Sequence, residues 1–255
     1  MSDNSARPQN GDAAIAFERV DKELNGRIVL DKVSFSVGYG ETLCILGRSG
    51  SGKSVALKLM IGLLKPDAGK VLVKGEDVAA LDSDGLLKIR RKMGFLFQGA
   101  ALFDSFTLYQ NLRMPLHRLD PAKSVDEIKL AVEGALRQVG LAKDGEKMPA
   151  TLSGGMQKRA GLARALVLRP EILLADEPTS ALDRITAGEI DDLLMKVKAE
   201  RPTTMVIVTH DVHGARRIAD KLVVLDQGRL LAFGTPEELD RKQDNRLLQE
   251  FISER

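Results

Sequence analysis

The chain has 255 residues, of which 44% are hydrophobic and 29% charged, an ordinary composition for a globular protein with one large domain. Its 38 basic and 36 acidic residues nearly cancel, which gives no general reason to expect a nucleic-acid partner. The single cysteine, Cys44, excludes an internal disulfide framework and a zinc site built from several cysteines.

The amino-terminal residues predict a flexible tail. Residues 1 to about 13 are polar, contain proline and glycine, and lack the apolar core of a signal peptide. No apolar run along the chain reaches the ~20 residues that a membrane helix needs. We therefore expect a cytoplasmic protein that works at the inner membrane only through a partner.

Strand-like and helical segments alternate over most of the chain. Strands are predicted near residues 14–20 and 33–37 and at ETLCILG, VLVKG and MGFLF, with a basic segment at Leu86–Lys92. After a helical middle region, strands return at EILLAD, MVIVTH and KLVVLD, and a helix is expected around Ile190–Val197. This alternation predicts a largely parallel α/β sheet that is covered on both faces.

The middle region, from about Gln98 to Arg164, is mostly helical in pattern. Ser124 and Glu127 form a capping box ahead of an amphipathic face, and Gly140 closes that helix. We interpret this region as a helical insertion into the α/β fold.

A glycine-rich segment, GRSGSGKS, joins an apolar strand to a helix, which is the context of a phosphate loop. Its glycines let backbone amides turn around a polyphosphate, and the helix presents its positive end. Lys53 would reach the β- and γ-phosphates, and the Ser54 hydroxyl would hold Mg²⁺. The predicted nucleotide-binding residues are Gly47, Arg48, Ser49, Gly50, Ser51, Gly52, Lys53 and Ser54.

Two adjacent carboxylates, Asp176 and Glu177, end the apolar run EILLAD. Buried carboxylates are costly unless they are paired or bound to a metal. In a parallel sheet with a phosphate loop, ligands sit beyond the carboxyl ends of the strands. We therefore expect Asp176 at the metal and Glu177 as the general base that takes a proton from the attacking water.

A third motif, LSGGMQKR, starts a long helix with Ser153, Gly154 and Gly155. It is a second anion-binding helix start in a chain that already has one. Together with the phosphate loop and ILLADEPTSALD, this ordered set resembles the ATP-binding cassette (ABC) family. The resemblance implies an α/β P-loop NTPase with a RecA-like, mostly parallel core, an antiparallel β subdomain and an inserted α-helical subdomain. We place the core at 14–97 and 164–255 and the helical subdomain at 98–163.

The resemblance also implies the rest of the site. Gln98 corresponds to the family's Q-loop glutamine, which contacts Mg²⁺ and the attacking water, and His210 to the switch histidine at the γ-phosphate. Two copies would close head to tail around ATP and Mg²⁺. The resemblance then assigns contacts with the second copy's nucleotide to Ser153, Gly154, Gly155 and Asp183.

One departure from the family concerns the adenine. The family usually stacks the base on an aromatic residue in the loop after the first strand. The corresponding segment here is KELNGR, with Leu24 or Asn25 near the expected position and no aromatic side chain. No adenine-binding residue is therefore predicted.

Finer local choices narrow the resemblance. Four segments resemble the corresponding segments in the ATPase of the Mla-type transporters. They are GKSV at the end of the phosphate loop, ALFDSFT after the Q-loop, LSGGM, and DRITAGEID, which begins within SALD. Those transporters move phospholipid to maintain the lipid asymmetry of Gram-negative outer membranes. The resemblance implies a multispanning permease, a membrane-anchored lipid-binding protein and a small regulatory protein as partners. Phe103, Phe106 and Tyr109 could line the groove for the permease's coupling helix or pack the helical region's own core.

Three alternatives stay open. One is the ATPase of another importer or of a cell-division complex, which would have the same active site. A second is an ABC protein outside transport, although long coiled-coil arms, zinc cysteines and a second cassette are missing from the sequence. A third is a phosphate-loop kinase, which would leave LSGGMQKR and His210 without a role.

Overall fold

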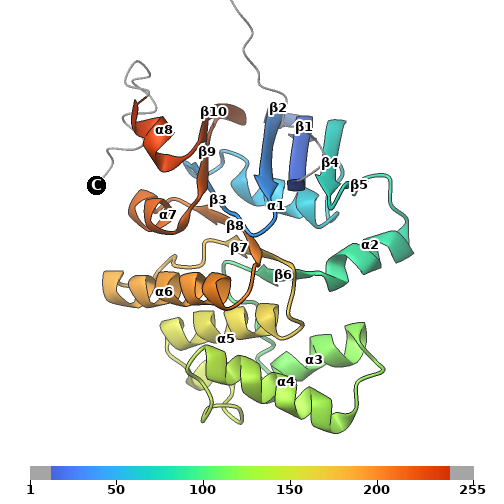
Figure 1. Cartoon of the computed structure of the whole chain (residues 1–255), viewed down its shortest axis with the longest axis vertical. Helices are drawn as coiled ribbons and strands as arrows, with labels where there is room; N and C mark the ends of the chain where they lie inside the picture. Colours follow the sequence, from blue (N-terminus) through green and yellow to red (C-terminus); the bar gives the residue numbers. More distant parts are fainter. Residues whose placement is uncertain (1–12, 242–255) are drawn as a thin grey trace, which may run out of the picture.

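The computed structural model describes residues 13–241 (Figure 1). Most of the predicted tail and the end of the chain, 242–255, therefore lie outside the described residues. Ala13 does not belong to a tail, because it begins the first strand and pairs with Gly38.

The main sheet has six strands in the order β10-β9-β3-β8-β7-β6. Its strands are β3 (Thr42–Gly47), β6 (Met93–Leu96), β7 (Ile172–Asp176), β8 (Thr204–Thr209), β9 (Lys221–Asp226) and β10 (Arg229–Gly234). All neighbouring pairs are parallel except β10 with β9. Each face of β3 is buried, with Leu43 and Ile45 in one hydrophobic core and Cys44 and Leu46 in the other. Such burial on both faces is what parallel strands require.

A smaller antiparallel sheet has the order β2-β1-β4-β5. Its strands are β1 (Ala13–Leu24), β2 (Arg27–Gly38), β4 (Ala68–Val73) and β5 (Glu76–Asp77). The inner face of this sheet shares a core with α1 and one face of the main sheet. Phe17 and Phe35 stack in that core with ring centroids 4.5 Å apart.

The helices complete the layers. They are α1 (Lys53–Met60), α2 (Ser83–Arg91), α3 (Leu108–Leu119), α4 (Val125–Gln138), α5 (Gly154–Leu166), α6 (Arg184–Glu200), α7 (Val212–Ile218) and α8 (Pro236–Arg241), with a 3₁₀ turn at Pro149–Thr151. Helices α3, α4 and α5 gather at the end of the molecule opposite the antiparallel sheet (Figure 1). The observed architecture confirms the predicted fold class. Within residues 13–241, no helix is both long and apolar enough to span a bilayer.

The helical insertion follows its local signals closely. Ser124 and Glu127 make both bonds of a capping box at the start of α4, and Gly140 takes a left-handed φ of 74° after the helix ends. The predicted division between residues 163 and 164 falls inside α5, which continues to Leu166.

Several predicted elements need correction. The strands expected at 14–20 and 33–37 are each 12 residues long and are joined by a two-residue turn at Asn25-Gly26, so KELNGR is a hairpin rather than an open loop. The basic segment Leu86–Lys92 is mostly the second half of α2, whose start is capped by Asp82. Strand β10 and helices α7 and α8 were not predicted.

Candidate active site

The phosphate loop lies between the end of β3 and the start of α1. Gly50 and Gly52 have φ values of 80° and 101°, which favour glycine. A Cβ atom at Gly52 would lie 2.6 Å from the carbonyl oxygen of Val29, so the loop also needs glycine for close backbone packing. A Cβ atom at Gly50 would meet open space, on the side from which a ligand could approach. The geometry is that of a backbone cradle in front of a helix N-terminus.

Lys53, the first residue of α1, is buried inside this loop. Its Nζ atom donates to the carbonyl oxygens of Gly47 at 2.7 Å and Arg48 at 3.1 Å, and lies 4.0 Å from Oε1 of Glu177. Burial lowers the pKa of Lys53, while the Glu177 and Asp176 carboxylates act in the opposite direction. The cation is therefore placed between the loop and the acid at the end of β7.

Ser54 and Asp176 come together from α1 and β7. The Ser54 hydroxyl donates to Oδ1 of Asp176 at 3.0 Å. Hydroxyl and carboxylate oxygens are ligands that Mg²⁺ binds, usually together with water and substrate phosphates. No group of three or more acidic, histidine or cysteine side chains suited to a metal occurs among residues 13–241. The chemistry of this pair fits two of the ligands of a magnesium ion.

Glu177 follows β7 and is only 8% exposed. It adopts a left-handed φ of 50°, which is unusual for a residue with a side chain, and its amide donates to the carbonyl of Val208 at 2.8 Å. Oε2 of Glu177 lies 2.8 Å from Nδ1 of His210, whose side chain is exposed at the end of β8. A carboxylate in an enclosed position with a histidine beside it can accept a proton from a bound water.

A cleft of about 810 Å³ lies at Lys53, Ser54 and Glu177, and Asp176, which bonds to Ser54, is not among the described residues that line it. The phosphate loop, Gln98, Glu177 and His210 all contribute to its walls, so the structure brings together residues from four separate segments of the chain. Leu24 and Val29, on either side of the β1–β2 turn, line the same cleft. Leu24 was considered from the sequence, whereas Val29 was missed because only the pairing of the two long strands places it at the phosphate loop.

The LSGG segment lies elsewhere. Ser153 caps α5 by accepting from the amide of Met156 at 3.3 Å, and both Ser153 and Gly154 are exposed. Gly155 is buried, and a Cβ atom there would lie 2.6 Å from Cγ2 of Thr186. Among the described residues that line the phosphate-loop cleft, none comes from this segment. In a single chain, therefore, LSGG does not complete that chain's own cleft.

Asp183 has a partner within its own helix. Its Oδ1 accepts from the amides of Ile185 and Thr186 at 3.0 Å each, and the Thr186 hydroxyl donates to Oδ2 at 2.7 Å. These bonds lower the pKa of Asp183 and cap α6. Asp183 is exposed, so the cap leaves it at the surface beside the start of α6.

An apolar groove of about 540 Å³ lies between β6, α3 and α5. Phe103 is 48% exposed and lines the groove, and its ring lies 5.8 Å from that of Phe106. Tyr109 instead packs against the hydrophobic core of the helical region. Phe103 thus lines an exposed apolar groove, whereas Tyr109 contributes to the packing of a core.

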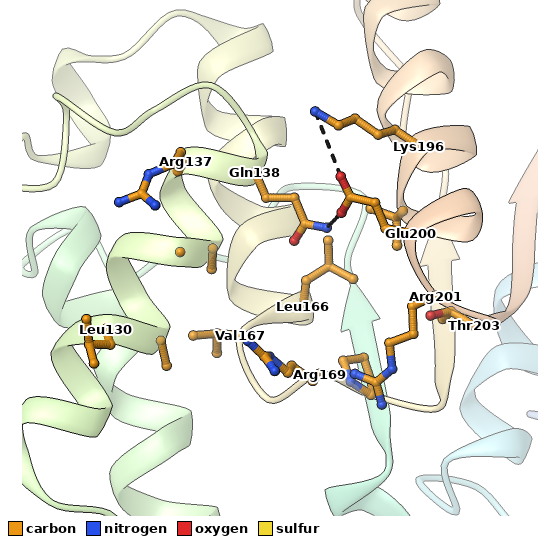
Figure 2. A pocket seen from close by; sticks show the side chains of 15 residues that line it. Leu130, Arg137, Gln138, Leu166, Val167, Arg169, Lys196, Glu200, Arg201 and Thr203 are labelled. Carbon is orange, nitrogen blue, oxygen red and sulfur yellow. Dashed lines mark hydrogen bonds and ion pairs between the residues drawn. The ribbon is translucent and has the colours of Figure 1, made fainter.

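A further cleft, of about 740 Å³, lies where α4 faces α6 and the segment after α5 (Figure 2). Gln138 Nε2 donates to Oε2 of Glu200 at 2.8 Å across it, and Nζ of Lys196 lies 3.9 Å from Oε1 of Glu200. It shares no lining residue with the cleft at the phosphate loop. This polar bridge links the helical insertion to the core and is separate from the phosphate-loop site.

Comparisons with known proteins relate the chain to a family. The sequence profile of the family described as ABC transporter matches residues 30–180, more than half of the chain. The probable ribonucleotide transport ATP-binding protein mkl of Mycobacterium leprae is 40% identical over 242 residues, which cover 95% of this chain and 69% of that protein. The methionine import ATP-binding protein MetN of Caulobacter vibrioides is 41% identical over 227 residues, covering 88% of this chain and 68% of MetN.

Solved structures show the same fold. The chain superposes on cbiO1 from Clostridium perfringens, part of the ABC transporter complex cbiONQ, with a TM-score of 0.82, 30% identity and coverage of 91% and 92% of the two chains. It superposes on the dimeric, post-hydrolysis cassette MJ0796 bound to ADP and Pi with a TM-score of 0.80, 35% identity and coverage of 87% and 98%. The chain therefore belongs to the ABC transporter family, as a subunit that binds and hydrolyses ATP.

Proposed function

We propose that ATP is hydrolysed where the phosphate loop meets Asp176, Glu177 and His210, and that hydrolysis drives phospholipid transport between the inner and outer membranes. The observation that carries the chemical part is the enclosed Glu177 carboxylate, with His210 at 2.8 Å and Lys53 at 4.0 Å. An acid held between the phosphate cradle and a histidine is positioned for proton transfer at the γ-phosphate.

The cradle binds and orients the nucleotide. Amides of residues 47–54 donate to the phosphates, and the Lys53 ammonium moves from the loop carbonyls to the β- and γ-phosphates when ATP binds. Leu24 and Val29 offer an apolar surface in place of an aromatic platform. Base selectivity at such a surface is expected to be weak, since neither side chain can hydrogen-bond the adenine.

Hydrolysis then needs one proton transfer. The water oxygen bonds to the γ-phosphorus, the bond from phosphorus to the bridging oxygen breaks, and ADP keeps that oxygen. Glu177 accepts the proton that the water loses. His210, bonded to the same carboxylate, fixes its orientation and contacts the γ-phosphate, while Gln98 orients the water.

Ser54 and Asp176 would hold Mg²⁺, with Gln98 as the third protein group. When bound, the ion neutralises charge on the β- and γ-phosphates. The hydrogen bond between Ser54 and Asp176 brings their oxygen atoms to one point beside the loop.

Each cleft is completed by a second copy of the chain. Ser153 and Gly154 are exposed at the start of α5 and lie outside their own chain's cleft. A helix N-terminus can contact a phosphate, so a head-to-tail homodimer would place Ser153, Gly154, Gly155 and Asp183 against the other copy's ATP. The dimeric MJ0796 cassette, which is similar to this chain, supports this arrangement.

Mixing two damaged chains tests the head-to-tail arrangement. One carries Ser153→Trp and the other Lys53→Met. Their mixed dimer has one pocket with both defects and one intact pocket, so mixing should restore ATP turnover above that of either variant alone. If each chain completed its own pocket, every pocket would carry a defect and mixing would restore nothing.

The membrane partner is a multispanning permease, which keeps this subunit on the cytoplasmic face of the inner membrane. The apolar groove at Phe103 is the proposed seat of the permease's coupling helix. cbiO1, which is similar in structure, is part of a transporter complex, and this supports the proposal. A membrane-anchored lipid-binding protein and a small regulatory protein complete the proposed assembly, which involves no nucleic acid.

Import of a small solute is the second candidate function. The similarity to MetN proteins, named for methionine import, and to mkl, named for ribonucleotide transport, favours it. Purification of the chain from membranes, with identification of the accompanying proteins and lipids, separates the two. A permease with co-purified phospholipid supports lipid transport, whereas a permease with a solute-binding protein supports import.

A further inference from the structure

Lys158 is a buried cation that the proposed mechanism does not use. It lies in the second turn of α5, the helix that starts at the LSGG segment, and is 8% exposed. A buried ammonium group is costly unless several acceptors surround it. Its surroundings therefore indicate why a lysine occupies this position.

The Lys158 ammonium bonds to three separate segments. It donates to the carbonyl oxygen of Gln98, to that of Glu177 at 3.1 Å and to the Ser180 hydroxyl at 3.2 Å. Ser180 in turn donates to the Glu177 carbonyl at 3.0 Å. One side chain thus joins the Q-loop, the end of β7 and the segment that leads to Asp183.

The backbone around these contacts is unusual. Glu177 and Ala181 have left-handed φ values of 50° and 62°, and Ala100 and Ala101 in the Q-loop have φ values of 59° and 50°. Non-glycine residues in this region are strained and persist only where their surroundings hold them. The bonds from Lys158 reach Gln98, Glu177 and Ser180, each of which is at or within three residues of one of these positions.

A second cation of α5 holds the far end of the Q-loop. Arg164 donates to the carbonyl oxygen of Ala101 and lies over the Phe103 ring at 5.9 Å. The Q-loop therefore stays attached to α5 when Lys158 is replaced. Because of this separate attachment, we expect Lys158 variants to fold.

We propose that Lys158 is a positioning residue that fixes the Gln98 and Glu177 backbones to α5 and thereby aims the Glu177 carboxylate at the attacking water. The proposal rests on the base role assigned to Glu177 above. Because α5 also begins with the exposed Ser153 and Gly154, a shift of this helix on contact with a second copy passes directly to Glu177. Lys158 thus links the surface that meets the second copy to Glu177, the general base in the cleft of its own chain.

The test compares Lys158→Met and Lys158→Arg in the full-length chain by steady-state ATP turnover and thermal unfolding. Lys158→Met keeps most of the side-chain length but removes the donor, so kcat should fall roughly 10- to 100-fold while KM for ATP stays within about twofold. Lys158→Arg keeps charge and donors and should recover most of kcat. Lys129→Met, a change at an exposed lysine on α4, is the matched control and should leave both constants unchanged.

Two results overturn the proposal. One is a Lys158→Met protein with normal kcat; the other is a loss of kcat that Lys158→Arg does not recover and that follows a fall in unfolding temperature. If Lys158→Met does not fold, Lys158→Leu is assayed, and normal kcat in that shorter variant, which also lacks a donor, overturns the proposal. Glu177→Gln is measured in parallel: if it loses turnover while Lys158→Met keeps it, only the positioning role fails, whereas normal turnover in Glu177→Gln removes the base itself.

Discussion

Replacement of Glu177 by glutamine isolates the proton-transfer step. Glutamine has nearly the same size as glutamate, so it fills the enclosed position and can keep a hydrogen bond to His210. It cannot accept a proton from water at neutral pH. A positioned general base contributes ~100- to 10,000-fold, so kcat should fall by that factor, equivalent to about 3–5 kcal/mol of activation free energy.

Nucleotide binding should respond in the opposite direction. The Glu177 carboxylate lies 4.0 Å from Lys53 and faces the cleft in which the triphosphate would lie. Removing its negative charge lowers repulsion of the γ-phosphate. Glu177→Gln should therefore bind ATP as tightly as the wild type or more tightly, and should accumulate as an ATP-bound dimer.

The assay is phosphate release at saturating Mg²⁺ and ATP, with equilibrium binding of a fluorescent ATP analogue measured in parallel. Glu171→Gln is the matched control, because Glu171 precedes β7 at the opposite end of the strand and pairs with Lys74 there. That control should keep its turnover. Turnover of Glu177→Gln within about threefold of the wild type would remove Glu177 from the base role.

Three further changes probe packing, charge and docking. Gly155→Ala places a Cβ atom 2.6 Å from Cγ2 of Thr186 and should lower the free energy of unfolding by about 1–3 kcal/mol, whereas Gly154→Ala, with its nearest atom at 3.8 Å, should not. Burial raises the pKa of Asp191 to about 6, so the folded state binds a proton that the unfolded state has already lost between about pH 4 and 6. The free energy of unfolding therefore falls as pH rises through this range. Asp191→Asn should raise the unfolding temperature more at about pH 8 than at about pH 5. Phe103→Ser should leave ATP turnover of the purified chain unchanged and prevent co-purification with the permease.

Each of these expectations can be contradicted by one measurement. Equal unfolding free energies for the two glycine variants would show that α5 moves away from Thr186 without cost. A stabilisation by Asp191→Asn that does not depend on pH would show that its carboxylate is not the group that titrates. A permease that still co-purifies with Phe103→Ser would place the docking surface outside the apolar groove.

Local sequence was enough to predict those parts of the site that consist of residues adjacent in the chain. Lys53 and Ser54 are adjacent in one loop and helix start, and Asp176 and Glu177 are adjacent at one strand end. Parallel pairing brings both ends to one edge of the sheet, and the observed bond between Ser54 and Asp176 follows from that topology. His210, which was assigned from the resemblance to the family, lies beside Glu177 at the end of β8.

Contacts that depend on register or on distant packing could not be predicted in this way. Val29 lines the cleft only because β1 and β2 extend to a two-residue turn, and the pairing of these strands is interrupted by several bulges. Strand β10 was missed because its hairpin turn is Gln227-Gly228, and glutamine is not a typical residue for a left-handed position. The bond from Lys158 to the Gln98 carbonyl spans 60 residues of sequence and depends on how α5 packs against β6.

The arrangement of α5 has a thermodynamic consequence for two copies of the chain. Its exposed N-terminus, at Ser153, is the surface proposed to meet the partner's nucleotide, and five residues later Lys158 contacts the carbonyl of Glu177 in its own chain. Any displacement of α5 that improves one contact changes the geometry of the other. Such coupling is reciprocal for binding. ATP in one pocket should therefore change the affinity of the second pocket for ATP by the same factor by which ATP in the second pocket changes the affinity of the first. The same helix therefore gives a structural reason to expect ATP binding in the two pockets to be coupled.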